Sequence, residues 1–496
     1  MKKCLQKVLF TAFIALLFMQ ICSPTAAGSA QNSKTVFKEK KLMDLPTNIL
    51  GILPYKNNYA IGTVNKNNEQ CLIINGKEGP GFNGISFESI MFSNEGKRII
   101  YIAAKGDDFV VVDNNKAGKA YSGIGNGTLV LSPDGGRLAY AVKKDNKWML
   151  VVDGKEGPVY DVIGEAPVFS ADGKHLAYAA QKDNKWFAVI DGKPGPQYDG
   201  IGALTYSPDS LHLAYIGVKD NKCYVIKDGK ASQEFDGFGG LAFSPDGKHF
   251  AYSCTNNDKW FCFVDDEPVR EYEGFAKGTF VYSPDSKRLA YVISQNNKLC
   301  VVVDNVPGPE TDGIGTLPQF SPDSNHIAYV ARVENMQVMV VDQKVSPKYE
   351  GIGGNSLVFS AEGGHVAYAI KSSNKWKVVN DGKAGKVYDQ IGGLTFSPDG
   401  QQMVYAASSD GKFHIVVNDS EQGSYDSVLT VPVFTADSKH MAFFASDGTN
   451  KCFMVADGKK SEIYQKLICD VAPSAEGGFE ATALKDRVIY HITWKP

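Results

Sequence analysis

The chain has 496 residues and a formal net charge of -3, from 52 lysines and arginines against 55 aspartates and glutamates. This balance provides no whole-chain basic surface for nucleic acid, and the hydrophobic content of 43% excludes a disordered chain. The 50 glycines favour many short strands joined by tight turns.

The N-terminal segment has the layout of a secretory signal peptide. Three lysines precede an apolar run over residues 8–21, and small residues follow it. The run is shorter than the roughly 20 residues that span a bilayer, and no later segment is longer. We therefore expect residues 1–30 to be a signal peptide cleaved after Ala27 or Ala30, no transmembrane segment, and a periplasmic or secreted mature protein.

The rest of the chain is one sequence unit repeated about twelve times. Ser-Pro-Asp-Gly, or a variant of it, recurs ten times from Ser93 to Thr435, so 342 residues contain nine steps of 38. Degenerate copies at Leu53 and Ser474 extend the pattern at both ends, and little length remains for a separate catalytic domain. The first residues of these tetrapeptides, called anchors below, are Ser93, Ser132, Ser170, Ser207, Ser244, Ser283, Ser321, Ser360, Ser397 and Thr435.

Each unit predicts four antiparallel strands. Around Ser170 the apolar and polar residues alternate in short runs, and the runs are separated by turn residues. Ser-Pro-Asp-Gly suits a type I turn, and Asp191-Gly192 suits a tight hairpin turn. Four-stranded units at this period are typical of β-propeller blades. The expected strands are 166–169, 175–181, 186–190 and one beginning at 197–198.

The two ends of the chain predict how the propeller closes. The segment 35–38 resembles a strand without a partner, and the last unit stops before its fourth strand, so pairing the two would cover both edges. Because propellers usually have 4 to 8 blades, we expect two six-bladed rings, with one large ring as the alternative. Blades 1–6 would occupy residues 31–277 and blades 7–12 residues 278–496.

The repeat resembles that of a known family. Tyr-Ser-Pro-Asp-Ser at 206–210 with Leu-Ala-Tyr at 213–215, and Phe-Ser-Pro-Asp-Gly at 243–247 with Phe-Ala-Tyr at 250–252, resemble the propeller repeat of the TolB family. The resemblance covers most of the chain and implies a periplasmic or secreted propeller that binds a partner. Two features of related proteins are not found in this sequence. They are the N-terminal mixed domain of TolB-like proteins and the Gly-x-Ser-x-Gly elbow of exported peptidases with similar blades.

Histidines and aromatic residues recur at fixed places, which favours structural roles. A single residue per blade lies far from its copies, so the histidines do not predict a shared metal site. A bulky residue sixteen positions after the anchor is expected to fill space between sheets, with sugar stacking as the alternative. The histidines five positions after the anchor are His175, His212, His249, His326, His365 and His440, with Arg98, Arg137 and Arg288 in other units. The aromatic residues are Trp148, Trp186, Trp260, Trp376, Phe109 and Phe413.

Two sets of lysines are predicted to encircle opposite faces, interleaved with aspartates. Such a near-neutral mixture favours solubility, with an anionic glycan or lipid head group as the alternative partner. One set, fifteen residues after the anchor, is Lys147, Lys185, Lys222, Lys259, Lys298, Lys375 and Lys412. The other, twenty-three residues after it, is Lys116, Lys155, Lys193, Lys230, Lys344 and Lys383.

Seven cysteines remain after the expected cleavage, so at least one thiol is unpaired. No Cys-x-x-Cys spacing occurs, and we expect small buried strand residues. Cys254 and Cys262 flank one turn and are the pair that a hairpin could bring face to face. The seven are Cys71, Cys223, Cys254, Cys262, Cys300, Cys452 and Cys469.

A site on a repetitive scaffold must break the repeat. The residues that do so form no recognisable catalytic constellation, and we predict no catalytic, cofactor or metal residues and no enzyme activity. We expect a binding scaffold for a protein or glycan partner in the bacterial envelope, its binding residues and oligomeric state being left open. The alternatives are a glycan hydrolase or lyase using the central pocket, and a self-associating surface protein. The repeat-breaking residues are Glu88, Glu165, Arg270, Arg332, Glu334 and Glu421.

Overall fold

Each 38-residue unit folds into one small antiparallel sheet, as the alternation of its residues predicts. In the unit anchored at Ser170, the turn residues 170–173 join a strand ending at Phe169 to one beginning at Leu176. The hairpin turn at Asp191 and Gly192 has φ angles of 47° and 78°, which suit aspartate and glycine. The computed structural model describes residues 37–56, 58–449 and 451–496, and residues 37–496 form one compact unit. The predicted signal peptide lies outside the described residues.

The first four sheets are numbered here as blades 1 to 4. Blade 1 contains β2 (Ile49–Tyr55), β3 (Asn58–Val64), β4 (Gln70–Ile74) and β5 (Lys77–Glu78). Blade 2 contains β6 (Gly84–Phe92), β7 (Ile99–Lys105), β8 (Asp108–Asp113) and β9 (Lys116–Tyr121). Blade 3 contains β10 (Gly123–Ile124), β11 (Val130–Leu131), β12 (Leu138–Lys144), β13 (Lys147–Val152) and β14 (Lys155–Tyr160). Blade 4 contains β15 (Val162–Ile163), β16 (Val168–Phe169), β17 (Leu176–Lys182), β18 (Lys185–Ile190) and β19 (Lys193–Tyr198).

Blades 5 to 8 repeat this order. Blade 5 contains β20 (Gly200–Tyr206), β21 (Leu213–Lys219), β22 (Lys222–Lys227) and β23 (Lys230–Ala231). Blade 6 contains β24 (Gly237–Phe243), β25 (Phe250–Asn256), β26 (Lys259–Val264) and β27 (Glu267–Tyr272). Blade 7 contains β28 (Gly274–Phe275), β29 (Val281–Tyr282), β30 (Leu289–Gln295), β31 (Lys298–Val303) and β32 (Val306–Pro307). Blade 8 contains β33 (Gly313–Ile314), β34 (Gln319–Phe320), β35 (Ile327–Val333), β36 (Met336–Val341) and β37 (Lys344–Val345).

Blades 9 to 12 complete the chain. Blade 9 contains β38 (Gly351–Ile352), β39 (Val358–Phe359), β40 (Val366–Ser372), β41 (Lys375–Asn380) and β42 (Lys383–Ala384). Blade 10 contains β43 (Gln390–Phe396), β44 (Met403–Ser409), β45 (Lys412–Val417) and β46 (Ser420–Tyr425). Blade 11 contains β47 (Ser427–Val428), β48 (Val433–Phe434), β49 (Met441–Ser446), β50 (Cys452–Ala456) and β51 (Lys459–Lys460). Blade 12 contains β52 (Lys466–Pro473), β53 (Phe479–Lys485), β54 (Val488–Trp494) and β1 (Phe37–Asp44).

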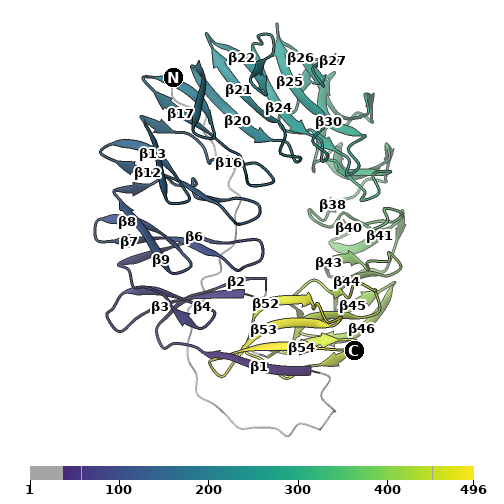
Figure 1. The fold of residues 1–496 in the computed structure, drawn as a ribbon. Helices are drawn as coiled ribbons and strands as arrows, with labels where there is room; N and C mark the ends of the chain where they lie inside the picture. The colour runs from purple at the N-terminus through teal and green to yellow at the C-terminus, as the bar shows by residue number, and fades with distance from the viewer. Residues whose placement is uncertain (1–36, 57, 450) are drawn as a thin grey trace. The chain divides into compact units, whose positions relative to one another are not determined.

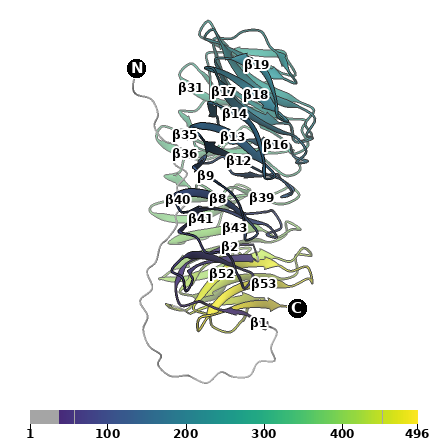
Figure 2. The ribbon, with the colours of Figure 1, turned by 60° about the vertical axis from the view of Figure 1, so that its left-hand side comes forward.

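The twelve sheets follow one another around a single ring, so the described residues form an all-β, twelve-bladed propeller (Figure 1). Figure 2 shows the blades from β2 to β19 succeeding each other along one side of that ring. In blades with five strands, two short strands pair with the same neighbour and together replace one continuous first strand, as β15 and β16 do with β17. The described residues contain no helix long and apolar enough to cross a bilayer.

The preference for two six-bladed rings is wrong, and the alternative of one large ring is what the structure has. The preference rested on the usual number of blades in a propeller. Two rings would need a break after blade 6, but blades 6 and 7 pack on each other as other neighbouring blades do. Tyr272 and Tyr291 cross this gap with hydroxyl oxygens 2.8 Å apart, and Phe275 packs in the same cluster. The Asp265-Asp266 turn, which lacks glycine, keeps positive φ angles of 53° and 66°.

Aromatic pairs and small residues make the core between blades. A ring near the end of one blade meets, edge to face, a ring on the strand that follows the anchor turn of the next blade, which is a favoured aromatic geometry. Beside these rings, alanines such as Ala177 and Ala214 are fully buried. Edge-to-face pairs with centroids 6.0 to 6.3 Å apart are Tyr160–Tyr178, Tyr198–Tyr215, Tyr272–Tyr291 and Tyr388–Tyr405.

The ring closes where the sequence predicts, by pairing the two ends of the chain. β1 is the outer strand of blade 12 and lies antiparallel to β54, with Phe37 opposite Trp494. Leu45 and Ile61 then pack with Ile489 in one cluster that joins blade 12 to blade 1. Each blade is therefore covered on both sides by neighbours, and only the outer strand edges face away from the ring.

Candidate binding site

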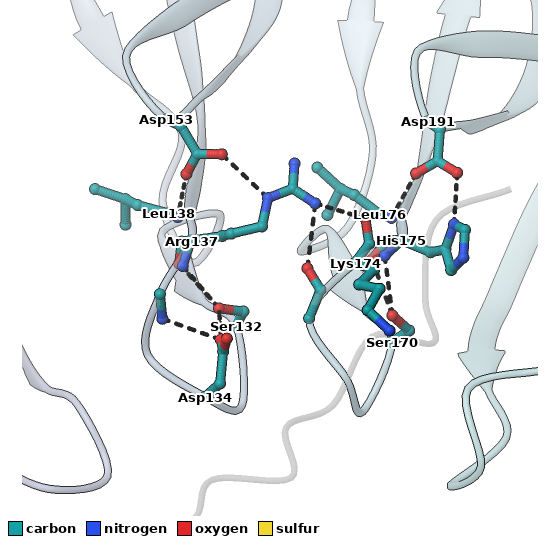
Figure 3. A network of polar contacts seen from close by, with 12 residues as sticks. Ser132, Asp134, Arg137, Leu138, Asp153, Ser170, Lys174, His175, Leu176 and Asp191 are labelled. Carbon is teal, nitrogen blue, oxygen red and sulfur yellow. Dashed lines mark hydrogen bonds and ion pairs between the residues drawn. The ribbon is translucent and has the colours of Figure 1, made fainter.

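The anchor turn is held by a hydroxyl and a carboxylate (Figure 3). Ser170 Oγ donates to Asp172 at 2.6 Å. It also accepts from the backbone N–H of His175 at 3.0 Å. The pKa of Asp172 is lowered, first by the Ser170 hydroxyl and then by the N–H of Lys174. The Ser-Pro-Asp-Gly pattern is thus explained by turn structure.

The residue five positions after the anchor links its own blade to the next. His175 Nδ1 lies 2.8 Å from Asp191 Oδ2, the other oxygen of Asp191 accepts from Leu176 N–H, and the imidazole stacks on Tyr206 of the next blade. We call this arrangement the inter-blade latch. The five corresponding His–Asp pairs, with nitrogen to oxygen distances of 2.6 to 2.8 Å, are His212–Asp228, His249–Asp265, His326–Asp342, His365–Asp381 and His440–Asp457.

Arginine makes a more extensive latch. Arg137 donates from Nε to Asp153 at 3.1 Å and from Nη1 to the carbonyls of Gly173 and Lys174 in the next blade, at 3.2 and 2.7 Å. Its guanidinium also lies over the Phe169 ring, 5.2 Å from the centroid. Figure 3 shows the two latch types side by side. These contacts confirm the structural role predicted for the residue five positions after the anchor. Separately, no group of three or more metal-ligating side chains occurs among residues 37–56, 58–449 and 451–496.

The two predicted lysine sets differ in their pairing. Those fifteen residues after the anchor pair with acidic side chains, such as Lys185 with Asp199 at 2.5 Å and Lys222 with Asp236 at 2.6 Å. Asp199 also accepts from the backbone N–H of Asp220, which ties the turn to the connection between blades. In contrast, the ammonium groups twenty-three residues after the anchor, such as Lys193, have no ion pair within the described part of the chain.

The tryptophans sixteen residues after the anchor fill space between blades, as predicted. Trp260 stacks on Phe275 of the next blade with centroids 6.3 Å apart, and Trp148 packs on the cluster that contains Ile163. They are half-buried, so part of each ring also remains accessible. Space filling therefore does not exclude a second role for an individual ring.

The repeat-breaking residues do not come together. Glu88 lies on β6, Glu165 between β15 and β16, Arg270 on β27 and Arg332 on β35. Two others are engaged locally, since Glu334 accepts from Lys348 at 2.5 Å. Glu421 accepts from Tyr388 at 3.0 Å and lies 3.6 Å from Lys386. The convergence of acids that would favour a hydrolase or lyase is not observed among them.

The cysteines are free in the structure, and six of the seven are buried. Burial raises the pKa of the Cys262 thiol to about 12 and that of Cys469 to about 11. Cys254 lies opposite Phe261, and Cys262 opposite Ser253, so the two thiols do not form a cross-strand pair. The six buried thiols act as small core side chains.

A cavity of 720 Å³ lies between blades 5 and 6 and is our candidate binding site. Val225, Tyr252, Phe263 and Pro268 provide apolar wall, which suits a site that removes a ligand group from water. Burial, followed by the charge of Asp266, raises the pKa of Tyr252, so this phenol stays neutral. The polar lining residues are His212, Lys227, Asp228, Lys230, Ser232, Gln233 and Asp266.

Some charged side chains around this cavity have partners within the protein, and others have no ion pair in the described residues. Asp228 is engaged by His212 at 2.6 Å and by the N–H of Leu213 at 3.0 Å. Lys227 contacts the Phe250 ring, 5.4 Å from its centroid, but neither Lys227 nor Lys230 has an ion pair within the described residues. The cavity therefore presents two ammonium groups together with the carboxylate of Asp266, which likewise has no ion pair within the described residues.

Lys227 is a repeat-breaking residue that the sequence reading missed. It stands twenty positions after its anchor, where Val152, Ile190, Val264 and Val303 occur in other blades. Comparison with the same position in the other units, which selected Glu165, would have selected Lys227 as well.

A second cavity, of 320 Å³, lies between blades 4 and 5. Its lining includes one of the repeat-breaking residues and one of the recurring aromatic residues. Glu165 and Trp186 both line it, together with small residues. The two cavities thus flank blade 5 on opposite sides.

Two histidines stand outside the repeat pattern. His414 contacts the carbonyl of Gly423 at 2.7 Å, and His491 lies 3.4 Å from Glu480.

Comparisons with protein families and with curated proteins find no match for this chain. Among similar solved structures, a eukaryotic initiation factor is 14% identical, covers 67% of this chain and 96% of its own, and has a TM-score of 0.34. The Cps50 (Swd1) β-propeller domain of Myceliophteria thermophila is 15% identical, with coverages of 52% and 99% and a TM-score of 0.25. TolB from Acinetobacter baumannii is 16% identical, with coverages of 51% and 76% and a TM-score of 0.23. These likenesses are too low to carry a functional argument, and the propeller fold rests on the sheets themselves.

Proposed function

We propose that this protein is an exported, non-enzymatic propeller scaffold that binds a protein or glycan partner in the bacterial envelope. The observation that carries the proposal is the cavity between blades 5 and 6, where Lys227 and Lys230 lack counter-ions beside an apolar wall. The lysines fifteen residues after the anchor pair with acids, as Lys185 does with Asp199, whereas Lys227 stands at a position where other blades have an apolar residue such as Ile190. A partner with carboxylate or other anionic groups next to an apolar surface fits this arrangement.

The location and the family are parts of the same proposal. The basic and apolar segment before residue 31 supports export. The Phe-Ser-Pro-Asp-Gly string at 243–247 supports placing the repeat with the TolB-like propellers. Expression of the full chain in a bacterium, followed by mass spectrometry of the periplasmic and secreted fractions, tests export. A mature N-terminus at Gly28 or Gln31 is expected, and an uncleaved cytoplasmic chain would contradict it.

Binding is tested with residues 31–496 immobilised against envelope extract and against a glycan array. Lys227→Ile introduces the residue type of Ile190, and combined with Lys230→Ala it should weaken partner capture at least tenfold. The matched control is Lys193→Ala, which removes the equivalent lysine of blade 4 and should leave capture unchanged. Raising the salt concentration should weaken capture because the contact is ionic. Equal capture by the double variant and the wild type would overturn the proposed site.

A further inference from the structure

The cavity between blades 4 and 5 combines an accessible aromatic ring with an unpaired carboxylate. It is bounded on one side by the connection between β15 and β16, on another by Trp186 of β18, and on the third by β20 of the next blade. Its volume of 320 Å³ is at the lower end of the range for small-molecule sites and suits one sugar ring. The lining residues are Gly164, Glu165, Ala166, Val168, Ala179, Trp186, Ile201, Gly202 and Leu204.

Small residues leave the space beside the indole open. A Cβ atom at Gly164 would lie 3.1 Å from Cζ3 of Trp186, so glycine lets the ring lie close to this connection. A Cβ at Gly202, on β20 of the next blade, would meet no heavy atom within 4 Å. The indole is thus closely contacted at Gly164, and the cavity wall at Gly202 adjoins unfilled space.

The carboxylate of Glu165 is not bound by another side chain of the described residues. Its side chain is exposed, and it makes no hydrogen bond or ion pair with any residue in the described ranges. An ionised carboxylate only accepts hydrogen bonds, and several hydroxyl donors can approach its two oxygens together. A carboxylate beside an aromatic ring favours a polyhydroxylated ligand ring. The hydroxyl groups of such a ligand donate to the carboxylate, and its C–H groups stack on the indole.

The pairing of acid and aromatic is rare among the blades. Glu165 stands five residues before its anchor and Trp186 sixteen after it, and only blade 2, with Glu88 and Phe109, repeats both features. Blade 3 has Trp148 but Gly127 at the acid position. Blade 3 thus fills the gap between blades with Trp148 and without the acid, so the acid needs a separate explanation.

We propose that this cavity binds a neutral pyranose unit of a glycan, with the sugar ring stacked on Trp186 and its hydroxyl groups donating to Glu165. The inference rests on the proposed binding function and names its ligand class. Like-charge repulsion at Glu165 disfavours uronic acids here, whereas the lysine-lined cavity between blades 5 and 6 favours anions. The two cavities are thus expected to take ligands of different charge, neutral in this one and anionic in the other.

The test is fluorine NMR of residues 31–496 labelled with 5-fluorotryptophan, which gives one resonance for each of the five tryptophans. The Trp186 resonance is assigned by its loss in Trp186→Phe. The methyl glycosides of glucose, galactose and N-acetylglucosamine are titrated, with methyl glucuronide as the charged comparison. At least one neutral glycoside should shift the Trp186 resonance saturably, with a Kd in about the millimolar range, and leave Trp148 unmoved.

Variants separate the roles of the two groups. Glu165→Ala should weaken this binding about tenfold, because it removes charge-assisted hydrogen bonds. Gly202→Leu should abolish it by narrowing the cavity, while the unchanged resonances of the other tryptophans report an intact fold. A Trp148→Phe control should bind like the wild type.

No shift with any neutral glycoside, equal shifts at Trp148 and Trp186, or unchanged affinity in Glu165→Ala would overturn the sugar site. Tighter binding of the glucuronide than of every neutral glycoside would overturn it as well. The outcome is separable from that of the proposed function. Loss of the sugar response with retained partner capture through Lys227 and Lys230 removes only this inference, and the reverse result removes only the lysine site.

Discussion

Replacing Arg137 with alanine should loosen the contact between blades 3 and 4. The side chain donates to Asp153, donates to two carbonyls of the next blade, and covers Phe169. Each carbonyl bond is worth about 1 kcal/mol. The ion pair, with 33% of the arginine side chain exposed, and the ring contact are each worth about 0.5 kcal/mol. We expect a loss of about 2 to 3 kcal/mol.

Two comparison variants make this number specific. Arg137→His converts the latch to the type seen at His175, which keeps the aspartate contact but loses the two carbonyl bonds, so about 2 kcal/mol should be lost. Arg332→Ala removes an exposed arginine that makes no ion pair in the described chain, and should change stability by less than about 0.5 kcal/mol.

Urea unfolding gives the free energies, and hydrogen exchange with mass spectrometry locates the effect. Peptides that contain Leu138 and Leu176, the amides beside the two neighbouring latches, should exchange faster in Arg137→Ala, while peptides of blades 8 and 9 should not change. If Arg137→Ala costs no more than Arg332→Ala, the latch does not couple the blades and the reasoning fails.

Three further outcomes follow from the cited contacts. The pKa of Asp172 is lowered in the folded protein, so its ionised carboxylate contributes to stability above about pH 4, and this contribution is lost as the pH falls. The melting temperature should therefore decline below that pH. A melting temperature that stays constant from pH 5 to 2 would contradict this. Burial, with hydrogen bonding to an acid, raises the pKa of Tyr388 to about 12, so its contribution to stability should be retained below about pH 10 and fall above it. Its tyrosinate absorbance, taken as the difference between the wild type and Tyr388→Phe, should appear only above that pH. A thiol reagent should modify the half-buried Cys223 first and the remaining six cysteines only after denaturation, and rapid modification of all seven would contradict the burial.

The local structure was predictable because each repeat carries its own turn chemistry. The type I turn at the anchor, the tight turn at Asp191 and the closing pair of chain ends follow from residue types and from unpaired edges. The fourth strand was underestimated, since β19 begins at Lys193 rather than near residue 197. Proline at positions 194 and 196 hides a strand signal that an edge strand tolerates.

The number of blades in a ring was not predictable in the same way. It depends on the turn from one sheet to the next, about 30° for twelve blades and about 60° for six. Identical repeats produce the same contacts at every gap, so the sequence shows no boundary. Which cavities remain open was equally hidden, because it depends on small side chains such as Gly164 and Gly202 from different blades.

The outer edges bear on the self-association alternative. The outermost strands of several blades carry proline, lysine and register shifts, as between Phe187 and Val189 opposite β19. These features discourage pairing between chains through exposed edges. Since six of the seven cysteines are buried, the structure offers no observation that favours self-association over partner binding.

The central claim is that one ring contains all twelve blades, and a cross-link between the chain ends tests it most directly. Lys38 lies opposite Thr493, and Glu39 opposite Ile492, in the β1–β54 pairing. Cysteine pairs at these two adjacent positions include one of the closer, non-hydrogen-bonded type, which favours a disulfide. The single ring predicts that mild oxidation of at least one double variant joins the two terminal peptides, as detected by mass spectrometry. Two separate rings would place these strands in different rings, and absence of the cross-link in both variants would contradict the account.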